Sequence, residues 1–259
     1  ARRRLRQQTN RPPRLMLATL PATTPPRQPN RNVVFSTPRG QRRLPPFAIK
    51  VLPMLTLYTW GTPNGRKVSI LLEELGLSYQ VEPVNILTDE QHTPAFRAIN
   101  PNGKIPALVD SDGPDGGPIS VFESAAIMQY LAEKHQRFLP ASGAARYAVL
   151  QWLMFQMGGF GPMLGQAHHF LRFAPEPVPY AMARYRNEAH RLYRVLDTQL
   201  TGRDYVADDY SIADMALYPW ACRHEWQEID LADFPQVARW MATLAARPAV
   251  ARGMAVPTA

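Results

Sequence analysis

The fold of this chain is decided by two neighbouring segments, NPNGKIPALVD at residues 100–110 and FESAAIMQYLAEK at residues 122–134. In the first segment Ile105 precedes Pro106, and the peptide bond before a proline is the one that adopts the cis form at modest cost. A sharp turn at this step would leave the N–H and C=O of Ile105 free. An extended peptide could pair with both groups, as an added strand does.

The second segment begins where a strand-like pattern gives way to a helical one. Ile119 and Val121 alternate with polar residues, and the apolar residues after Ser124 follow helical spacing. Ser124 is therefore predicted to be a helix N-cap, and the first N–H groups beside it and Glu123 would attract a carboxylate. Together the two segments could hold a peptide backbone and its terminal carboxylate. A plain hairpin followed by a capped helix explains the same spacing.

Composition divides the chain into two unlike pieces. Residues 1–53 contain 12 of the 29 basic residues, ten prolines and no Asp or Glu. The remaining 17 basic residues face 21 acidic ones, so residues 54–259 carry about −4 while the whole chain carries +8. A basic, proline-rich segment with few aromatic residues cannot bury enough surface to offset its ordering entropy, so residues 1–53 are predicted to be disordered.

Three explanations of this extension remain open at this point. An arginine-rich arm could contact nucleic acid, although the only aromatic residues here are Phe35 and Phe47. An organellar transit segment would also be rich in Arg and free of acid, but this one is poor in Ser and has no sustained amphipathic helix. Alternatively, the start of translation is assigned too far upstream, because Met54 stands directly before the first predicted strand. Nucleic-acid binding is not expected.

The 206 residues that follow suffice for one large domain or two small ones. The single cysteine, Cys222, rules out an intramolecular disulfide framework and is typical of a reducing compartment, so a cytoplasmic location is expected. Since the sequence has no run of 18 apolar residues, no membrane span is expected.

The pattern after Met54 predicts an α/β half followed by an all-α half. A short strand from Leu55 precedes Thr62-Pro63, which fits an N-cap followed by proline in the first helical turn, and Gly76 would end that helix. Residues 79–86 form a second predicted strand, and two further strands flank the turn-rich segment SDGPDGGP. The order β-α-β, β-β-α is similar to the thioredoxin fold, and this half is assigned to residues 54–135.

A linker at 136–142 leads to a helical region at 143–259. Helices are predicted at about 144–157 and 179–200, and GGFGP at 158–162 is expected to break or kink the first of them. The sequence from Ser211 to Asp214 matches an S-x-x-D cap at the start of another helix.

Residues 54–256 resemble the glutathione transferases. The motifs TPNG (62–65), NGKIPALVD, FESAAI, GGFGPMLGQAHHF and PYAMARY are similar to those of the nu class, the disulfide-bond oxidoreductase-like group of bacterial glutathione transferases. The resemblance implies a thioredoxin-like N-terminal domain and an all-helical C-terminal domain. It also implies glutathione as co-substrate, no metal, and a homodimer that binds a small disulfide or electrophile.

The resemblance assigns a binding role to seven residues. Ile105, with Pro106 in the cis form, would pair with the cysteinyl part of glutathione, and Glu123 and Ser124 would hold its γ-glutamyl end. Gln91 and Lys104 occupy positions that contact the glycyl end. Arg184 matches a position that reaches across the dimer interface in this group, although an Arg on a helix surface is more often simply solvated.

The residues near the glutathione sulfur determine the chemistry. Related enzymes use Tyr, Ser or Cys there, whereas this chain has Thr62 and Asn64 and no cysteine in its first half. Both side chains can donate hydrogen bonds to a thiolate, and the helix N-terminus favours the ionised sulfur. Thr62 could also serve merely as a helix cap, and Tyr58 is kept as a substitute. The nucleophile is thus predicted to be the thiolate of glutathione.

The nu-class resemblance implies reduction of a small disulfide by two glutathione molecules, a reaction that needs no enzyme cysteine. Conjugation of an electrophile and reduction of an organic hydroperoxide are alternative reactions. A non-catalytic glutathione-binding regulator or ligand carrier is a further alternative, because the fold also supports proteins without enzymatic activity. His168 and His169 would diverge on a helix and could not easily share a metal, but one of them could line the substrate pocket. Cys222 is interpreted as an inert core thiol.

Overall fold

This computed structural model describes residues 54–257. A mixed four-stranded sheet organises the first half of this range. The strands are β1 (Leu55–Thr59), β2 (Tyr79–Pro83), β3 (Ala107–Asp110) and β4 (Ile119–Phe122), in the spatial order β2-β1-β3-β4. β1 pairs in parallel with β2 and antiparallel with β3, and β3 pairs antiparallel with β4. The predicted disordered extension, residues 1–53, lies outside the described residues.

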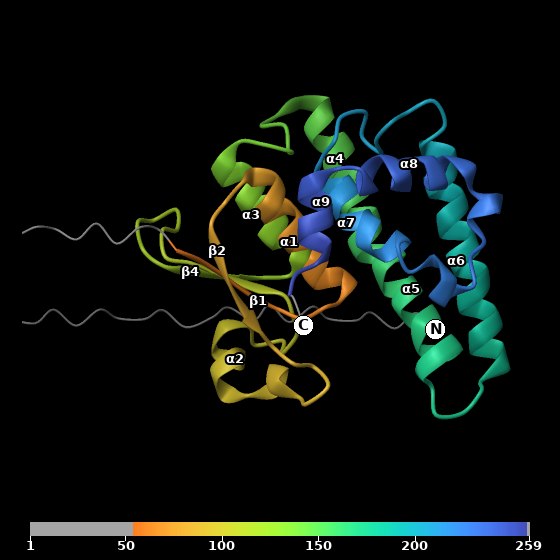
Figure 1. Cartoon of the computed structure of the whole chain (residues 1–259), viewed down its shortest axis with the longest axis horizontal. Helices are drawn as coiled ribbons and strands as arrows, with labels where there is room; N and C mark the ends of the chain where they lie inside the picture. Colours follow the sequence, from red (N-terminus) through yellow and green to blue (C-terminus); the bar gives the residue numbers. More distant parts are fainter. Residues whose placement is uncertain (1–53, 258–259) are drawn as a thin grey trace, which may run out of the picture. The chain divides into compact units, whose positions relative to one another are not determined.

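Helices cover both faces of this sheet (Figure 1). On one face α1 (Pro63–Leu75) and α3 (Ser124–His135) pack against buried residues such as Leu57 and Leu108. On the other face α2 (Pro94–Ile99) places Phe96 in a smaller cluster with Val84 and Ala107. A short 3₁₀ turn, η1 (Glu90–His92), precedes α2.

The turn from β1 into α1 is held by three local features. Thr62 is the N-cap of α1, and its hydroxyl oxygen accepts a hydrogen bond from the N–H of Gly65 at 3.3 Å. A Cβ at Gly65 would lie 2.2 Å from Thr59 Oγ1, so only glycine lets the helix approach β1 this closely. Gly76 ends the helix in the left-handed conformation, with φ of 69°. The start of α1 is therefore held in a fixed position beside the sheet.

The second half of the described chain is helical. Its α-helices are α4 (Gly143–Phe155), α5 (Gly161–His168), α6 (Pro179–Gln199), α7 (Ile212–Ala221), α8 (Pro235–Ala245) and α9 (Pro248–Met254). Two π-helical turns, η2 (Gln156–Phe160) and η3 (His169–Phe173), and two 3₁₀ turns, η4 (His224–Gln227) and η5 (Leu231–Asp233), complete it.

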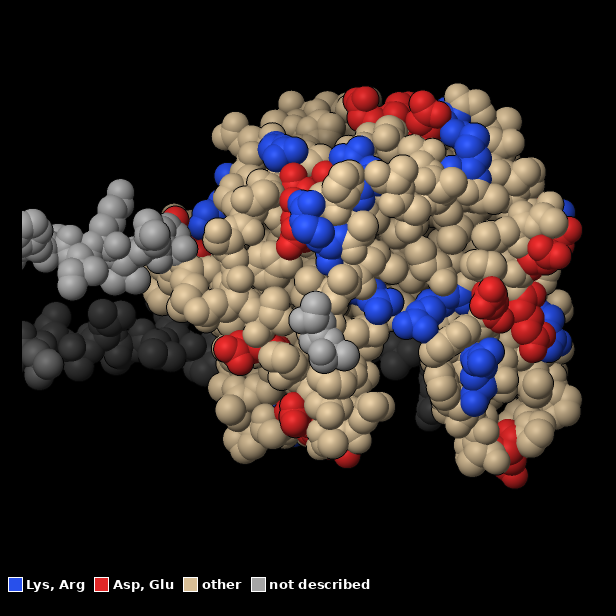
Figure 2. Space-filling model, in the orientation of Figure 1, with Lys and Arg blue, Asp and Glu red and all other residues tan. Residues whose placement is uncertain are grey.

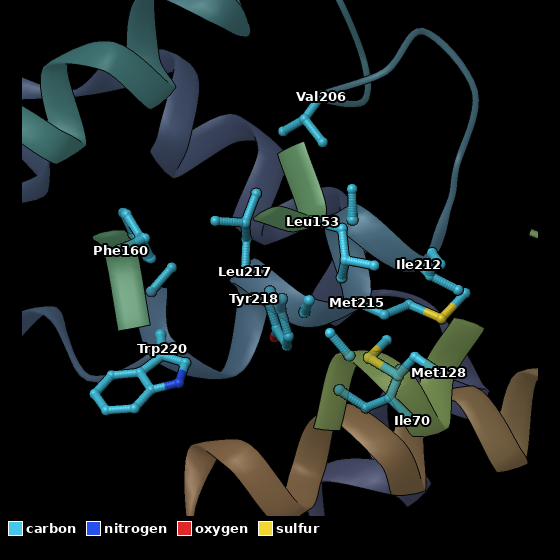
Figure 3. Packing of buried hydrophobic residues seen from close by; sticks show 14 of the residues in the cluster. Ile70, Met128, Leu153, Phe160, Val206, Ile212, Met215, Leu217, Tyr218 and Trp220 are labelled. Atoms are coloured by element: carbon cyan, nitrogen blue, oxygen red, sulfur yellow. The ribbon is translucent and has the colours of Figure 1, made fainter. Parts of the chain in front are cut away.

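A shared apolar core joins the two halves. Figure 3 shows Ile70 of α1 and Met128 of α3 next to Ile212 and Met215 of α7. At its rim Arg247 donates two hydrogen bonds to the carboxylate of Glu74, at 2.7 and 2.9 Å. The helical half is thereby fixed against α1, the helix that begins at the site.

The capping box of α7 forms a buried cluster of hydrogen bonds in this core. Asp214 is fully buried, and its Oδ1 accepts hydrogen bonds from the N–H of Val206 and from Trp240 Nε1 at 3.0 and 2.9 Å. Its Oδ2 accepts from the N–H and the hydroxyl of Ser211, and the Ser211 hydroxyl accepts from the N–H of Ala213. The S-x-x-D prediction is confirmed.

The predicted fold class is also confirmed, with four local differences. The second strand ends at Pro83 instead of reaching residue 86, and α2 was not predicted because six residues give too short a helical pattern. Residues 158–162 do not break the helix, since a π-helical turn carries it from α4 into α5. Ser124 is the first residue of α3 and not its N-cap, which is Glu123. The division at 136–142 falls on a segment without helix or strand, and the domain boundaries stay a prediction.

Charged side chains on the visible face are interspersed rather than gathered by sign (Figure 2). No helix among residues 54–257 is long and apolar enough to cross a membrane.

Candidate functional site

A cavity of about 450 Å³ opens at the N-terminus of α1. Its volume lies within the range of about 300–1,000 Å³ that is typical of small-molecule sites. Thr62, Asn64, Gln91, Lys104 and Ile105 all line it. Five of the residues predicted from the sequence therefore meet in one cavity, although they come from three separate segments.

Thr62 has its donor free, although it caps α1. Capping uses a lone pair of Oγ1, which accepts from the N–H of Gly65. The hydroxyl hydrogen makes no hydrogen bond to another described residue, and Thr62 lines the cavity, so it can donate to a ligand. Capping and ligand contact thus coexist in this side chain.

Asn64 is oriented by a residue 156 positions away in the sequence. Trp220 Nε1, at the end of α7, donates to Asn64 Oδ1 at 3.0 Å. An indole N–H is only a donor, so the amide oxygen must face Trp220 and the amide NH₂ must point elsewhere. The backbone N–H of Asn64 also has no acceptor among residues 54–257. Asn64 thus presents donors to the cavity at the positive end of a helix.

The peptide bond between Ile105 and Pro106 is cis, as predicted. Neither the N–H nor the C=O of Ile105 forms a hydrogen bond within the described part of the chain. Asn100 Nδ2 donates to the carbonyl of Lys104 at 2.5 Å and holds the preceding turn in place. Ile105 can therefore pair with an extended peptide, which is the geometry that the sequence predicted.

A second cavity, of about 470 Å³, adjoins the first and shares with it Asn64, Lys104, Gly165 and Trp220. Glu123 lines its wall and is exposed. With φ of 68°, Glu123 has a backbone conformation that is uncommon for a residue other than glycine and that concentrates at functional sites. Ser124 is buried behind it and lines a small pocket with Ile105 and Pro106.

Gln91 and Lys104 both line the first cavity. The Nε2 of Gln91 donates to Asp89 Oδ1 at 3.2 Å, while its Oε1 is buried without a partner among the described residues. Lys104 is exposed. Arg184 is exposed on α6 and lines neither cavity, so within a single chain it is separate from the other predicted site residues. Its role across a dimer interface stays a prediction.

Two buried polar residues that line the second cavity, Lys67 and Gln156, were not predicted from the sequence. Lys67 on α1 is 1% exposed, and its ammonium donates to Gln156 Oε1 at 2.6 Å and to Ser124 Oγ at 3.3 Å. Burial lowers the pKa of Lys67 to about 7, and the nearby Glu123 carboxylate opposes this shift. One signal was available, because Lys67 lies one helical turn before Leu71, on the apolar face of α1.

His168 and His169 both line the first cavity, whereas the sequence suggested that one of them could do so. His168 is buried, its ring stacks on Trp220, and burial lowers its pKa to about 4, so it is neutral near pH 7. Its Nε2 lies 3.1 Å from the amide nitrogen of Gln227, which can only donate, so His168 Nε2 is the acceptor. Among the described residues, no group of three or more His, Cys, Asp or Glu side chains could hold a metal ion.

Tyr58, which was kept as a substitute near the sulfur, and the single cysteine both lie outside the site. Tyr58 lines a different cavity with Phe96, on the opposite side of β1 from α1. Cys222 lies just after α7 and lines neither site cavity, and burial raises the pKa of its thiol. A raised pKa makes the reactive thiolate scarcer, which agrees with the inert role predicted for Cys222.

Comparison with known proteins supplies the family. Residues 62–134 match the glutathione S-transferase N-terminal domain and residues 162–248 match the glutathione S-transferase C-terminal domain. The disulfide-bond oxidoreductase YfcG of Escherichia coli is 46% identical over 203 residues, which cover 78% of this chain and 94% of that protein.

Solved structures agree with the sequence comparison. A glutathione transferase from Burkholderia graminis, with two glutathione molecules bound per subunit, is 46% identical and has a TM-score of 0.75 over 79% of this chain and 89% of its own. A glutathione transferase from Pseudomonas putida, with one glutathione disulfide bound per subunit, is 47% identical and has a TM-score of 0.75 over 79% of this chain and 92% of its own. This chain therefore belongs to the glutathione S-transferase family.

Proposed function

We propose that this protein is a glutathione-dependent disulfide-bond oxidoreductase in which the nucleophile is the thiolate of bound glutathione. The observation that carries the proposal is the donor set at the start of α1. Among residues 54–257, the Thr62 hydroxyl hydrogen, the Asn64 amide nitrogen and the Asn64 backbone N–H have no hydrogen-bond partner, and no cysteine lines either cavity. Such donors stabilise a thiolate but cannot replace it as a nucleophile.

The reaction needs two glutathione molecules and balances without any redox group from the protein. The first thiolate attacks one sulfur of the substrate disulfide, forms a mixed disulfide and releases the other half as a thiolate, which takes up a proton. The second glutathione thiolate then attacks the glutathione sulfur of the mixed disulfide. Glutathione disulfide forms, and the second substrate thiol leaves. The two joined cavities offer space for both tripeptides, and the relatives solved with two glutathiones or one glutathione disulfide support this assignment.

The remaining residues would position glutathione around the sulfur. The free N–H and C=O of Ile105, preceding the cis Pro106, would pair with the cysteinyl backbone. Glu123 and Ser124 would hold the γ-glutamyl group, while Gln91 and Lys104 would contact the glycyl carboxylate end. The buried, unpartnered Oε1 of Gln91 is available to accept a hydrogen bond from a peptide N–H.

The test of the proposal is disulfide reduction by a protein that lacks its only cysteine. We expect Cys222→Ser to keep kcat/KM for glutathione and a small symmetrical disulfide within about two-fold of wild type, because the thiol lines neither cavity. Thr62→Val is the sensitive control, since it removes a hydroxyl from the cavity and should lower kcat/KM about ten-fold. An inactive Cys222→Ser protein, with unchanged folding, would contradict the proposal.

Trp220→Phe tests whether Asn64 must be held in place. Phenylalanine keeps an aromatic ring against His168 but removes the donor to Asn64 Oδ1, so the amide can rotate away from the sulfur. We expect kcat/KM to fall by about 3- to 10-fold, the equivalent of one neutral hydrogen bond.

Trp226→Phe is the matched control for that substitution. Trp226 lies against Phe173 and His168, and its indole N–H makes no hydrogen bond within residues 54–257. Its kcat/KM should stay near that of wild type. Equal losses in the two variants would mean that ring packing, not the bond to Asn64, is what matters.

Conjugation of an electrophile is the second candidate, because the first cavity also has apolar wall residues, Ile86 and Phe173, beside Thr62. It would use the same thiolate. A crystal structure with glutathione separates the two reactions. Two stacked thiols per subunit support disulfide reduction, and one tripeptide facing an open apolar pocket supports conjugation. Tight glutathione binding without turnover of a disulfide, an electrophile or a hydroperoxide would instead indicate a carrier or regulator.

A homodimer, with Arg184 reaching the site of the partner, and a cytoplasmic location are parts of the same proposal. Sedimentation of the wild type and of Arg184→Ala, together with the KM for glutathione of each, tests the dimer and the contact separately.

A further inference from the structure

Lys67 is a buried lysine that has no carboxylate among its hydrogen-bond partners in residues 54–257. Its side chain is 1% exposed, and its hydrogen-bond acceptors are Gln156 Oε1, Ser124 Oγ and, at 3.5 Å, the thioether sulfur of Met157. None of these acceptors carries a charge. Burying an ammonium without a counter-ion is costly, so burial favours the neutral amine until a negative charge binds nearby.

Gln156 provides a second, independent observation at the same place. It is fully buried, and its Nε2 has no hydrogen-bond partner among the described residues. It begins the π-helical turn η2 and lines the second cavity together with Glu123. A Cβ at Gly161 would come within 2.5 Å of this Nε2, so glycine there leaves room for the amide. A buried donor without a partner at the wall of a cavity indicates that it donates a hydrogen bond to an oxygen of a bound ligand.

These contacts also determine what Ser124 can do. Because the Lys67 ammonium donates to Ser124 Oγ, the serine oxygen acts as an acceptor toward the protein interior. Its hydroxyl hydrogen has only the weakly accepting sulfur of Met157, at 3.6 Å. Ser124 can therefore turn this hydrogen toward an anion in the pocket that it lines with Glu123.

We infer that Lys67 is the positioning residue of the γ-glutamyl site, and that binding of the γ-glutamyl α-carboxylate is coupled to uptake of one proton by Lys67. This inference rests on the proposed use of glutathione. Lys67 acts through Ser124 and Gln156, which contact the carboxylate, and its charge balances the charge that the carboxylate brings. Glu123 remains available for the ammonium of the same γ-glutamyl group.

The direction of the proton transfer follows from the surroundings of Lys67. Burial lowers its pKa to about 7, against the field of Glu123 at the start of α3. Two other cations are close to Lys67: Lys104, from the loop before β3, lines the same cavity, and Arg66 precedes Lys67 on α1. The residues that η2 contributes, Gln156 and Met157, are uncharged. A bound carboxylate adds a negative charge, which raises the pKa of Lys67 again. Between about pH 7 and pH 10, binding should therefore take up a proton.

The experiment is calorimetric titration with S-methylglutathione, which has no thiol to ionise, at about pH 8 in buffers of different ionisation enthalpy. At that pH a lysine with a pKa of about 7 is roughly nine-tenths neutral. We expect wild type to take up at least about half a proton more than Lys67→Met, and the variant to bind about 10- to 100-fold more weakly. Lys67→Gln, which keeps a donor but cannot take a proton, should also lose the extra uptake.

Lys104→Met is the matched control, because it removes an exposed lysine from the same cavity. It should weaken binding without changing the proton count, because the inference assigns the proton uptake to Lys67. Melting curves identify any variant that fails to fold, and Lys67→Gln then replaces Lys67→Met. Equal proton uptake by wild type and a folded Lys67 variant overturns the inference. Binding of S-methylglutathione by a wild type that reduces no disulfide overturns the proposed function and leaves the inference standing.

Discussion

Replacing Asn64 by Asp should lower kcat/KM for glutathione-dependent disulfide reduction about 1,000-fold. Aspartate has nearly the shape of asparagine, so it still accepts the hydrogen bond from Trp220 Nε1 that holds Asn64 Oδ1 at 3.0 Å. It loses the amide donors, and a charge-assisted hydrogen bond contributes about 1.5–3 kcal/mol. It also places a carboxylate beside the thiolate, and this repulsion adds roughly 1–2 kcal/mol. A total of about 4 kcal/mol corresponds to the stated factor.

Asn64→Ala separates the two causes. Alanine removes the donors without adding a charge, so its kcat/KM should fall about 10- to 100-fold, clearly less than that of the aspartate variant. The rate of Asn64→Asp should also reach its maximum at a higher pH than that of wild type, because a neighbouring negative charge raises the pKa of a thiol. Steady-state rates from about pH 6 to 10 measure both effects. If Asn64→Asp retained more than a third of the wild-type kcat/KM, the sulfur would not lie beside Asn64.

Replacing Asp214 by Ala should lower the free energy of unfolding by about 4 kcal/mol. Alanine leaves four buried donors without this acceptor: the N–H of Val206, Trp240 Nε1, and the N–H and hydroxyl of Ser211. Each unpaired buried donor costs about 1–3 kcal/mol. The loss of the capping box also leaves the start of α7 without its cap, and α7 is the helix that carries Trp220. Chemical denaturation followed by tryptophan fluorescence gives the free energy of unfolding.

Asp204→Ala is the control for that measurement. Asp204 has an 80% exposed side chain and accepts one hydrogen bond from Arg239, at 3.0 Å. An exposed ion pair of this kind contributes about 0–1 kcal/mol, so this variant should unfold almost as wild type does. A loss below about 1 kcal/mol in Asp214→Ala would show that the capping box is not needed to hold α7.

Much of the fold could be predicted because its turns have local signatures. Thr62-Pro63 and Gly76 mark the two ends of α1, and Ser211 and Asp214 mark the start of α7. Each signature depends on residues within a few positions of one another. Glu123 shows where such local reasoning fails. The change of periodicity predicted the N-cap at Ser124, but the N-cap is Glu123, which has a positive φ.

The parts of the site that were missed depend on contacts between distant residues. Trp220 orients Asn64 although 156 positions separate them in the sequence, and Gln156 accepts a hydrogen bond from Lys67 across 89 positions. No short motif encodes these pairs, and they form only once α7 and η2 pack against α1. The positions of Thr62, Asn64, Ile105 and Glu123 could be predicted since each lies at a recognisable turn or helix start. Whether Arg184 reaches a partner stays a prediction, because a single chain does not contain the contact.

If the protein ionises the thiol of bound glutathione, the thiolate must be visible by its ultraviolet absorbance in the glutathione complex of Cys222→Ser, titrated against pH. Without the protein cysteine, the whole signal belongs to glutathione. A free thiol has a pKa of about 8.5, and the donors at the start of α1 should lower that of the bound thiol by about two units. We expect a thiolate band that persists at pH 7 and disappears at this pH in Asn64→Asp. A bound thiol that titrates with the same pKa as free glutathione would contradict it.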